Sequence, residues 1–118
     1  MTESTGLPQL SAEDAKLVTL ARATRARTGA PVAAAVRDLD GRTYAAATVD
    51  LPSLQVSAVG VAVGMAVASG AQGVEAVVVL TGAELSTGDL EVVRDFAGAG
   101  VPVLRGTPAG KIEETRVT

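Results

Sequence analysis

The sequence has no cysteine and no histidine, and among its 118 residues there are one tyrosine, one phenylalanine and no tryptophan. The absence of Cys and His excludes disulfides, thiolate nucleophiles, imidazole bases and the usual zinc ligands. So few aromatic rings make no stacking platform for bases, and 10 basic against 13 acidic residues provide no positive field for phosphates. We therefore expect no nucleic-acid binding, no metal and no other cofactor.

Small aliphatic residues replace the missing aromatic ones. Hydrophobic residues make up 47% of the chain and aromatic residues 2%, so the core must consist of Val, Ala and Leu. A chain of this length forms one domain, and folding at this size hides only about two-thirds of the unfolded surface. We predict a single domain over residues 1–118 that buries further apolar surface as a homo-oligomer, a dimer or a tetramer.

The two ends of the chain are more polar than its middle. Residues 1–10 are expected to form a flexible N-terminus. Because the first residues lack the basic and then apolar pattern of a signal peptide, we expect the protein in the cytoplasm. Residues 107–118 are expected to form a polar C-terminal tail with room for one edge strand.

The stretch from Gln55 to Gly70, "QVSAVGVAVGMAVASG", carries no charge. A membrane span is one interpretation, but the segment is rich in Ala and Gly, its flanks are acidic, and Pro52 leaves about 18 residues where about 20 are needed. We therefore expect a buried helix and no membrane insertion. Gly60 and Gly64, four residues apart, then predict close backbone approach to a sheet or to a second copy of the helix.

Hydrophobic periodicity orders the other segments. A helix is expected from an N-cap at Ser11 to about residue 27, and "PVAAAVRDLDGRTYAAATVD" predicts two strands joined by a turn at Asp40-Gly41. In that turn the carboxylates of Asp38 and Asp40 are expected on the solvated surface. "VEAVVVL" and "VPVLRG" predict buried strands, with "STGDLEVVRDFAGAG" as a helix between them. This order predicts a three-layer α/β/α sandwich whose mixed sheet begins with a β-hairpin.

Local sequences at matching places in this order resemble the cytidine deaminase superfamily. They are "DGR" at the hairpin turn, "TVD" at the end of the second strand, "SAV" at the start of the central helix and "LSTGD" before the next helix. The family has an N-V-E-like motif, C/H-A-E and P-C-x-x-C at the last three places. The resemblance covers roughly residues 15–106 and implies a cytidine deaminase-like fold.

The resemblance also implies which chemistry is missing. In the family, one Cys or His and two Cys hold a zinc ion that activates a water, and the Glu moves protons during deamination. The corresponding ligand positions here are Ser57, Ser86 and Asp89, and the proton-shuttle position is Val59. Two neutral hydroxyls and one carboxylate do not make a zinc site. The chain therefore resembles a degenerate member with no catalytic residues and no metal.

The family's ribose-binding Asn and Glu correspond here to Thr48 and Asp50, of which Asp50 could still accept a hydrogen bond from a sugar hydroxyl. The loop that carries the family's aromatic ring is shortened to "RTGAP". We predict a non-catalytic protein that acts through assembly or by binding a nucleoside-like molecule or a protein partner. The alternative is a nucleoside-processing hydrolase or deaminase with a zinc-free site around Asp50, Ser57, Ser86 and Asp89.

Overall fold

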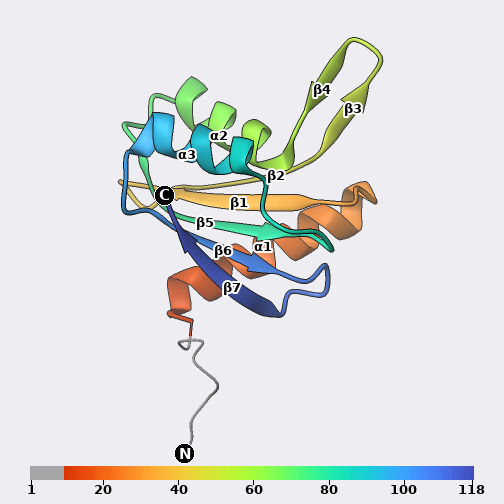
Figure 1. The fold of residues 1–118 in the computed structure, drawn as a ribbon, viewed down its shortest axis with the longest axis horizontal. Helices are drawn as coiled ribbons and strands as arrows, with labels where there is room; N and C mark the ends of the chain where they lie inside the picture. Colours follow the sequence, from red (N-terminus) through yellow and green to blue (C-terminus); the bar gives the residue numbers. More distant parts are fainter. Residues whose placement is uncertain (1–9) are drawn as a thin grey trace, which may run out of the picture.

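The computed structural model describes residues 10–118, whose elements form three layers (Figure 1). Helix α1 (Ala12–Thr28) covers one face of a five-stranded sheet, and helices α2 (Ala58–Ala68) and α3 (Thr87–Ala97) cover the other. The predicted three-layer α/β/α sandwich is confirmed. Apart from its last residue, the segment predicted as a flexible N-terminus lies outside the described residues.

The sheet is mixed, as predicted. Its strands lie in the order β2 (Thr43–Ala47), β1 (Ala33–Asp38), β5 (Val74–Leu80), β6 (Pro102–Gly106) and β7 (Ile112–Val117). Strands β5 and β6 are parallel, and the other neighbouring pairs are antiparallel. The central strand β5 is covered on both faces, which explains the apolar run from Ala76 to Leu80 along most of its length. Strand β7, at one edge, consists of residues from the predicted polar tail.

Two apolar clusters hold the three layers together. One lies between the sheet and the α2/α3 layer and includes Val59, Val63 and Val93, and the other lies under α1 around Leu17 and Ala21. Along β1 alternate side chains point to opposite faces of the sheet, so one short strand contributes to both clusters. The thin core of Val and Ala that the composition predicts is therefore what joins the layers.

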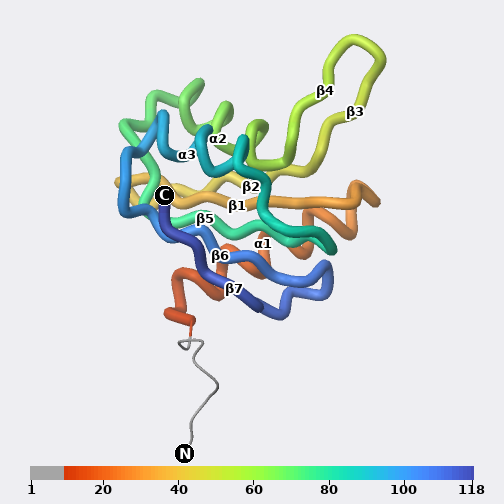
Figure 2. Tube along the Cα trace, viewed as in Figure 1, coloured from red at the N-terminus to blue at the C-terminus, as the bar shows by residue number. Residues whose placement is uncertain are grey.

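The central helix is shorter than predicted. Residues 54–56, which include the start of the predicted helix, form strand β4 (Leu54–Val56), which pairs with β3 (Val49–Leu51) in a separate hairpin. Ser57 sets the start of α2, because its hydroxyl accepts a hydrogen bond from the backbone N of Gly60 at 3.0 Å. The β3–β4 hairpin stands away from the body of the molecule in the ribbon and in the trace (Figures 1 and 2).

Helix α2 has one buried and one exposed face. Its buried residues pack on the sheet, whereas Met65 and Val67 are 40% and 52% exposed. A Cβ added to Gly64 would meet no atom within 4 Å, so this glycine makes no close approach inside the subunit. The helix has 11 residues, and none of the helices in residues 10–118 has the length and hydropathy that crossing a membrane requires.

The prediction that Asp38 lies on the solvated surface is wrong, because its side chain is buried and only 1% exposed. Its Oδ1 accepts hydrogen bonds from the backbone N of Asp40 and Arg42, both at 2.9 Å, and its Oδ2 accepts one from the Tyr44 hydroxyl at 2.8 Å. Of the turn residues only Gly41 has a positive φ, 87°. The hairpin turn is therefore organised by a buried carboxylate, and not by two residues in left-handed conformations.

Asp38 makes the stability of the hairpin depend on pH. Desolvation alone would raise the pKa of its carboxyl, but the hydrogen bonds from Tyr44, Arg42 and Asp40 outweigh it and hold the pKa below its usual value. A carboxyl with a lowered pKa stabilises the fold above its unfolded-state pKa of about 3.9, and this contribution disappears as the pH falls through the folded-state pKa.

We expect Asp38→Asn to melt at a lower temperature than the wild type at pH 7, because a neutral amide accepts these hydrogen bonds less strongly. The difference should shrink as the pH falls below about 4, where the wild-type carboxyl also becomes neutral. Melting curves by circular dichroism between about pH 7 and pH 2.5 measure it. A difference that stays constant over this range would show that the charge of Asp38 does not stabilise the turn.

Candidate functional site

Helices α2 and α3 begin beside each other on the same side of the sheet, and each begins with a serine. Ser57 caps α2 through the Gly60 backbone N, and the hydroxyl of Ser86 accepts a hydrogen bond from the backbone N of Asp89, each at 3.0 Å. A serine N-cap satisfies one of the free backbone N–H groups of a first helical turn. Both helices therefore start at defined residues, and their first turns face a common site.

One hydrogen bond joins the two helices at this site. The hydroxyl of Ser57 donates to Oδ1 of Asp89 at 2.7 Å, and Asp89 lies in the first turn of α3, where the helix dipole favours a carboxylate. Ser86 belongs to the same cluster, because it caps the turn that carries Asp89. The structure thus brings together the three residues at the ligand positions that the family resemblance implies.

The donor set of this cluster does not fit zinc. Zinc in proteins is held by thiolates and imidazoles, with carboxylates as additional ligands, whereas here two neutral hydroxyls accompany one carboxylate. The hydroxyl of Ser57 already accepts from the backbone N of Gly60 and donates to Asp89, so one of its two lone pairs and its proton are in use. Within residues 10–118 no group of three or more His, Cys, Asp or Glu side chains is placed to hold a metal ion.

Val59, at the position that the family resemblance implies for a proton shuttle, is part of the core. It lies in the first turn of α2, is 1% exposed and packs in the cluster between the helices and the sheet. Its side chain has no group that gains or loses a proton. At this position the chain therefore has a packing residue in place of a general acid or base.

Thr48 and Asp50, at the positions that the family resemblance implies for ribose contacts, lie where β2 continues into the β3–β4 hairpin. With Ser57 they line an open hollow of about 350 Å³. The backbone N and the hydroxyl of Thr48 both donate to the carbonyl of Val32, at 3.1 and 3.4 Å. Thr48 thus uses its hydroxyl within its own backbone, whereas Asp50 is exposed to solvent.

Sequence reasoning missed Thr81, which lines a second hollow of about 180 Å³ together with Ser86 and Asp89. Thr81 is 6% exposed, and its hydroxyl accepts a hydrogen bond from the backbone N of Ala83 at 3.1 Å. The available signal was its place directly after β5, because ligands of open α/β sheets bind at the carboxyl ends of parallel strands. The cluster of Ser57, Ser86 and Asp89 thus lies between two hollows.

Comparison with known proteins gives a family model and similar folds. The model described as cytidine deaminase-like matches residues 10–110. The cytidine deaminases of Mycobacterium leprae and Burkholderia pseudomallei are each 21% identical to the chain, with TM-scores of 0.71 and 0.73. The alignments cover 92% of this chain in both cases, and 94% and 92% of those chains.

The cytidine deaminase of Mycobacterium tuberculosis is 19% identical, with a TM-score of 0.67, and the alignment covers 88% of this chain and 91% of that one. No curated protein matches the sequence. At identities this low, the likeness to the solved structures shows a shared fold. The residues that occupy the site decide what chemistry this fold can perform here.

Proposed function

The chain belongs to the cytidine deaminase-like family, and on that premise we propose that it is a non-catalytic member that acts through assembly or binding. One observation carries the proposal: the hydrogen bond from Ser57 to Asp89, 2.7 Å long, joins two of the residues at the family's ligand positions. Neither residue offers a thiolate or an imidazole to a metal, and Val59 offers no proton-transfer group. Elemental analysis of the purified protein, with a deamination assay on cytidine and deoxycytidine, tests it.

A zinc-free hydrolase or deaminase is the alternative, and it would have to use Ser57 as the nucleophile with Asp89 as its base. The contact between them is the observation that favours it. Serine nucleophiles, however, are activated by imidazole or amine bases, and the chain has no histidine. Its two lysines, Lys16 and Lys111, lie on α1 and in the β6–β7 turn, away from the cluster. The same geometry therefore supports a structural link better than catalysis.

Assembly is supported by apolar side chains on the side of the molecule that carries α2. Met65 and Val67 on α2, and Leu51 and Leu54 at the tip of the β3–β4 hairpin, are between 40% and 55% exposed. The hairpin rises on the same side of the sheet as α2 (Figure 1). Large apolar side chains gathered on one side of a small domain mark a surface for protein contact. A dimer or tetramer formed through this side would cover them.

Binding of a nucleoside-like molecule is supported by the hollow beside Asp50 and Ser57. We expect cytidine or a related nucleoside to raise the melting temperature. A ligand at about ten times its dissociation constant stabilises the fold by about 1.4 kcal/mol, which corresponds to a shift of roughly 4–8 °C. Asp50→Asn should reduce the shift, and Asp40→Asn, in the β1–β2 turn, should not. Thermal melts with a panel of nucleosides at millimolar concentration measure it. If no nucleoside changes the melting temperature, Asp50 is only a strand residue.

A further inference from the structure

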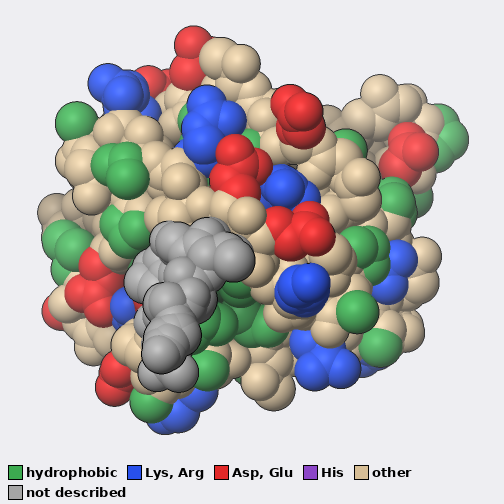
Figure 3. All heavy atoms as spheres, turned by 60° about the horizontal axis from the view of Figure 1, so that its bottom comes forward, with side chains coloured by type: hydrophobic (Ala, Val, Ile, Leu, Met, Phe, Trp, Pro, Cys, Tyr) green, Lys and Arg blue, Asp and Glu red, His purple; other side chains and the backbone are tan. Residues whose placement is uncertain are grey.

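On the α1 side of the molecule, several cations form no ion pair with a carboxylate of residues 10–118. The second half of α1 contains Arg22, Arg25 and Arg27 and no acidic residue, and Lys111 lies in the turn between β6 and β7. The ion pairs found within residues 10–118 all involve other arginines. Figure 3 shows Lys and Arg side chains gathered at its lower right, with no Asp or Glu side chain among them in that view. The second half of α1 is therefore positive, although the net charge of the chain is −3.

A groove of about 420 Å³ lies between α1 and the β6–β7 turn. Arg22, Arg25 and Thr19 are the polar residues that line it, and Pro108, Ala109 and two alanines of α1 supply an apolar surface. Nε of Arg25 donates a hydrogen bond to the carbonyl of Pro31 at 3.4 Å, which leaves the two terminal nitrogens of its guanidinium for a ligand. The Thr19 hydroxyl donates to the carbonyl of Ala15 at 3.2 Å within α1. None of the residues that line it carries a negative charge. The groove therefore combines two arginine side chains with an apolar surface.

Arg22 is held in place by the turn. A Cβ on Gly110 would lie 2.5 Å from Cδ of Arg22 and 3.1 Å from its Cγ, so the arginine stem crosses this glycine in close contact. Gly110 has a φ of 99°, a conformation that favours glycine. The turn is itself fixed, because the backbone N of Thr107 donates to the carbonyl of Lys111, and that of Gly110 to Thr107, both at 2.8 Å. A stem that is already ordered loses less conformational entropy when its guanidinium binds a ligand.

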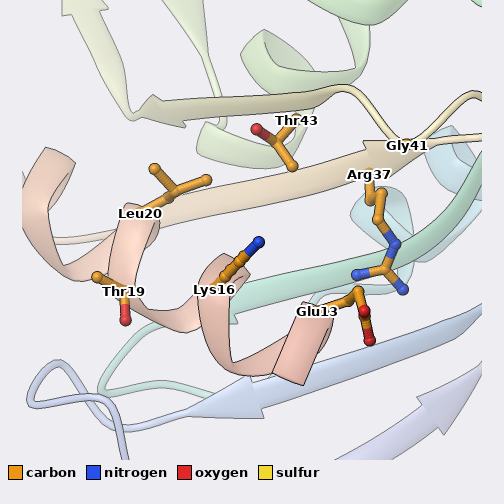
Figure 4. A pocket seen from close by; sticks show the side chains of 7 residues that line it. All are labelled: Glu13, Lys16, Thr19, Leu20, Arg37, Gly41 and Thr43. Carbon is orange, nitrogen blue, oxygen red and sulfur yellow. The ribbon is translucent and has the colours of Figure 1, made fainter. Parts of the chain in front are cut away.

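The hollow on the other side of α1 is larger, but its cations are outnumbered by carboxylates. It has a volume of about 460 Å³, and Glu13, Lys16 and Arg37 line it (Figure 4). Arg37 is already paired with Asp14 and Glu75. With these partners counted, three carboxylates accompany two cations there. The groove, in contrast, is lined by two arginines and by no carboxylate.

We propose that the groove docks an acidic, extended segment of a partner protein. Arg22 and Arg25 lie one turn apart on the helix, where side chains start about 5–6 Å from each other. An extended chain places every second side chain on the same side, about 6.6 Å apart. Two Glu or Asp residues at positions i and i+2 can thus each meet one guanidinium in a charge-assisted, bidentate contact. An apolar residue at i+4 then lies over Pro108 and Ala109.

The groove remains open in an assembly formed through the α2 side, because α1 lies on the opposite face of the sheet. The inference does not depend on the proposed function. A nucleic acid fits the groove less well than a peptide, because two arginines neutralise few phosphates and the net charge of −3 repels a polyanion. With one tyrosine and one phenylalanine in the whole chain, stacking cannot compensate.

The test uses ¹⁵N-labelled protein and a synthetic peptide of the pattern Glu-Ser-Glu-Ser-Leu, with a twin in which Gln replaces both Glu. The acidic peptide should shift the amide resonances of Thr19, Arg22 and Ala109, and the Gln twin should not. The double variant Arg22→Gln/Arg25→Gln, which changes the net charge by as much as the control below, should weaken binding at least about tenfold, since losing one hydrogen bond between ionised groups already corresponds to such a factor. The matched control Arg94→Glu, on α3, should bind like the wild type.

The proposal is overturned if the acidic peptide causes no shifts in the groove, if the Gln twin binds equally well, or if the double variant binds like the wild type. A single-stranded oligonucleotide is the second probe. If it binds at the groove more tightly than the peptide at the same salt concentration, the partner is a nucleic acid and the inference is wrong. A loss of binding in Arg94→Glu equal to that in the double variant would show only the effect of net charge, and it would also overturn the proposal.

Discussion

After dialysis the purified protein should contain far less than one zinc per chain, and it should not deaminate cytidine or deoxycytidine. The reason lies in the three positions implied as ligands, where Ser57 donates to Asp89 and Ser86 caps the turn that carries it. Hydroxyls that stay protonated at neutral pH do not compete for zinc with thiolates and imidazoles. Without an activated water the rate should fall to the uncatalysed one, at least about 10⁶-fold below that of an enzyme.

Elemental analysis and a spectroscopic deamination assay measure both quantities. The positive control is the variant Ser57→Cys/Ser86→Cys/Asp89→Cys, which replaces the hydrogen-bonded cluster with three thiols at the starts of the same two helices. We expect it to bind about one zinc per chain, at least about a hundredfold more tightly than the wild type, because thiolates are the ligands that zinc selects. A wild-type protein that retains about one zinc per chain through dialysis would disprove the proposal that the metal site is lost.

Gly64→Leu should convert the assembled protein to monomers and leave the fold of each subunit intact. A Cβ at Gly64 meets no atom within 4 Å inside the subunit, so a leucine there has room, and it is also the better helix former. If a second copy packs closely on this face, the added side chain overfills the contact and costs about 1–3 kcal/mol for each copy of the substitution. A symmetric contact contains two copies of the substitution. The dissociation constant of the dimer should therefore be about 30- to 10⁴-fold higher in Gly64→Leu than in the wild type.

Light scattering coupled to size-exclusion chromatography measures the assembly, and circular dichroism checks the fold. Gly88→Leu is the matched control, because Gly88 is a glycine of α3 whose Cβ also meets no atom within 4 Å. Gly60→Leu should instead damage the subunit itself, because a Cβ there lies 2.9 Å from Cγ1 of Val56. If the wild type is a monomer, and Gly64→Leu is an unchanged monomer, the assembly proposal is wrong.

Several elements could be predicted because their signals are local. The hydroxyl of Ser11 accepts a hydrogen bond from the backbone N of Asp14, and Gly29 ends α1 with a φ of 68°. Both ends of this helix are therefore determined by residues directly next to it in the sequence. The run of apolar residues in β5 indicates a strand covered on both faces, and that is where the strand lies. The family resemblance followed from the order of such elements.

Other features could not be predicted from the sequence. Some are segments too short to show a hydrophobic pattern, and others depend on a side chain that a neighbouring strand supplies. The β3 and β4 strands have three residues each, and no periodicity can be recognised over that length. The burial of Asp38 depends on Tyr44, which reaches it from the next strand. A turn that contains two aspartates therefore predicts solvent exposure for both, and this prediction is wrong for Asp38.

The sequence by itself determined the fold class and the available chemistry, because hydrophobic period, caps and turns act over a few residues, and a chain without Cys or His cannot supply thiolates or imidazoles. Only the tertiary structure decided which polar groups meet. Ser57 and Asp89 are 32 residues apart in the chain, yet packing of α2 and α3 on one sheet face brings their side chains to 2.7 Å. The groove of Arg22 and Arg25 likewise exists because the β6–β7 turn folds back against α1. Such contacts depend on how separate elements pack, and no local pattern encodes them.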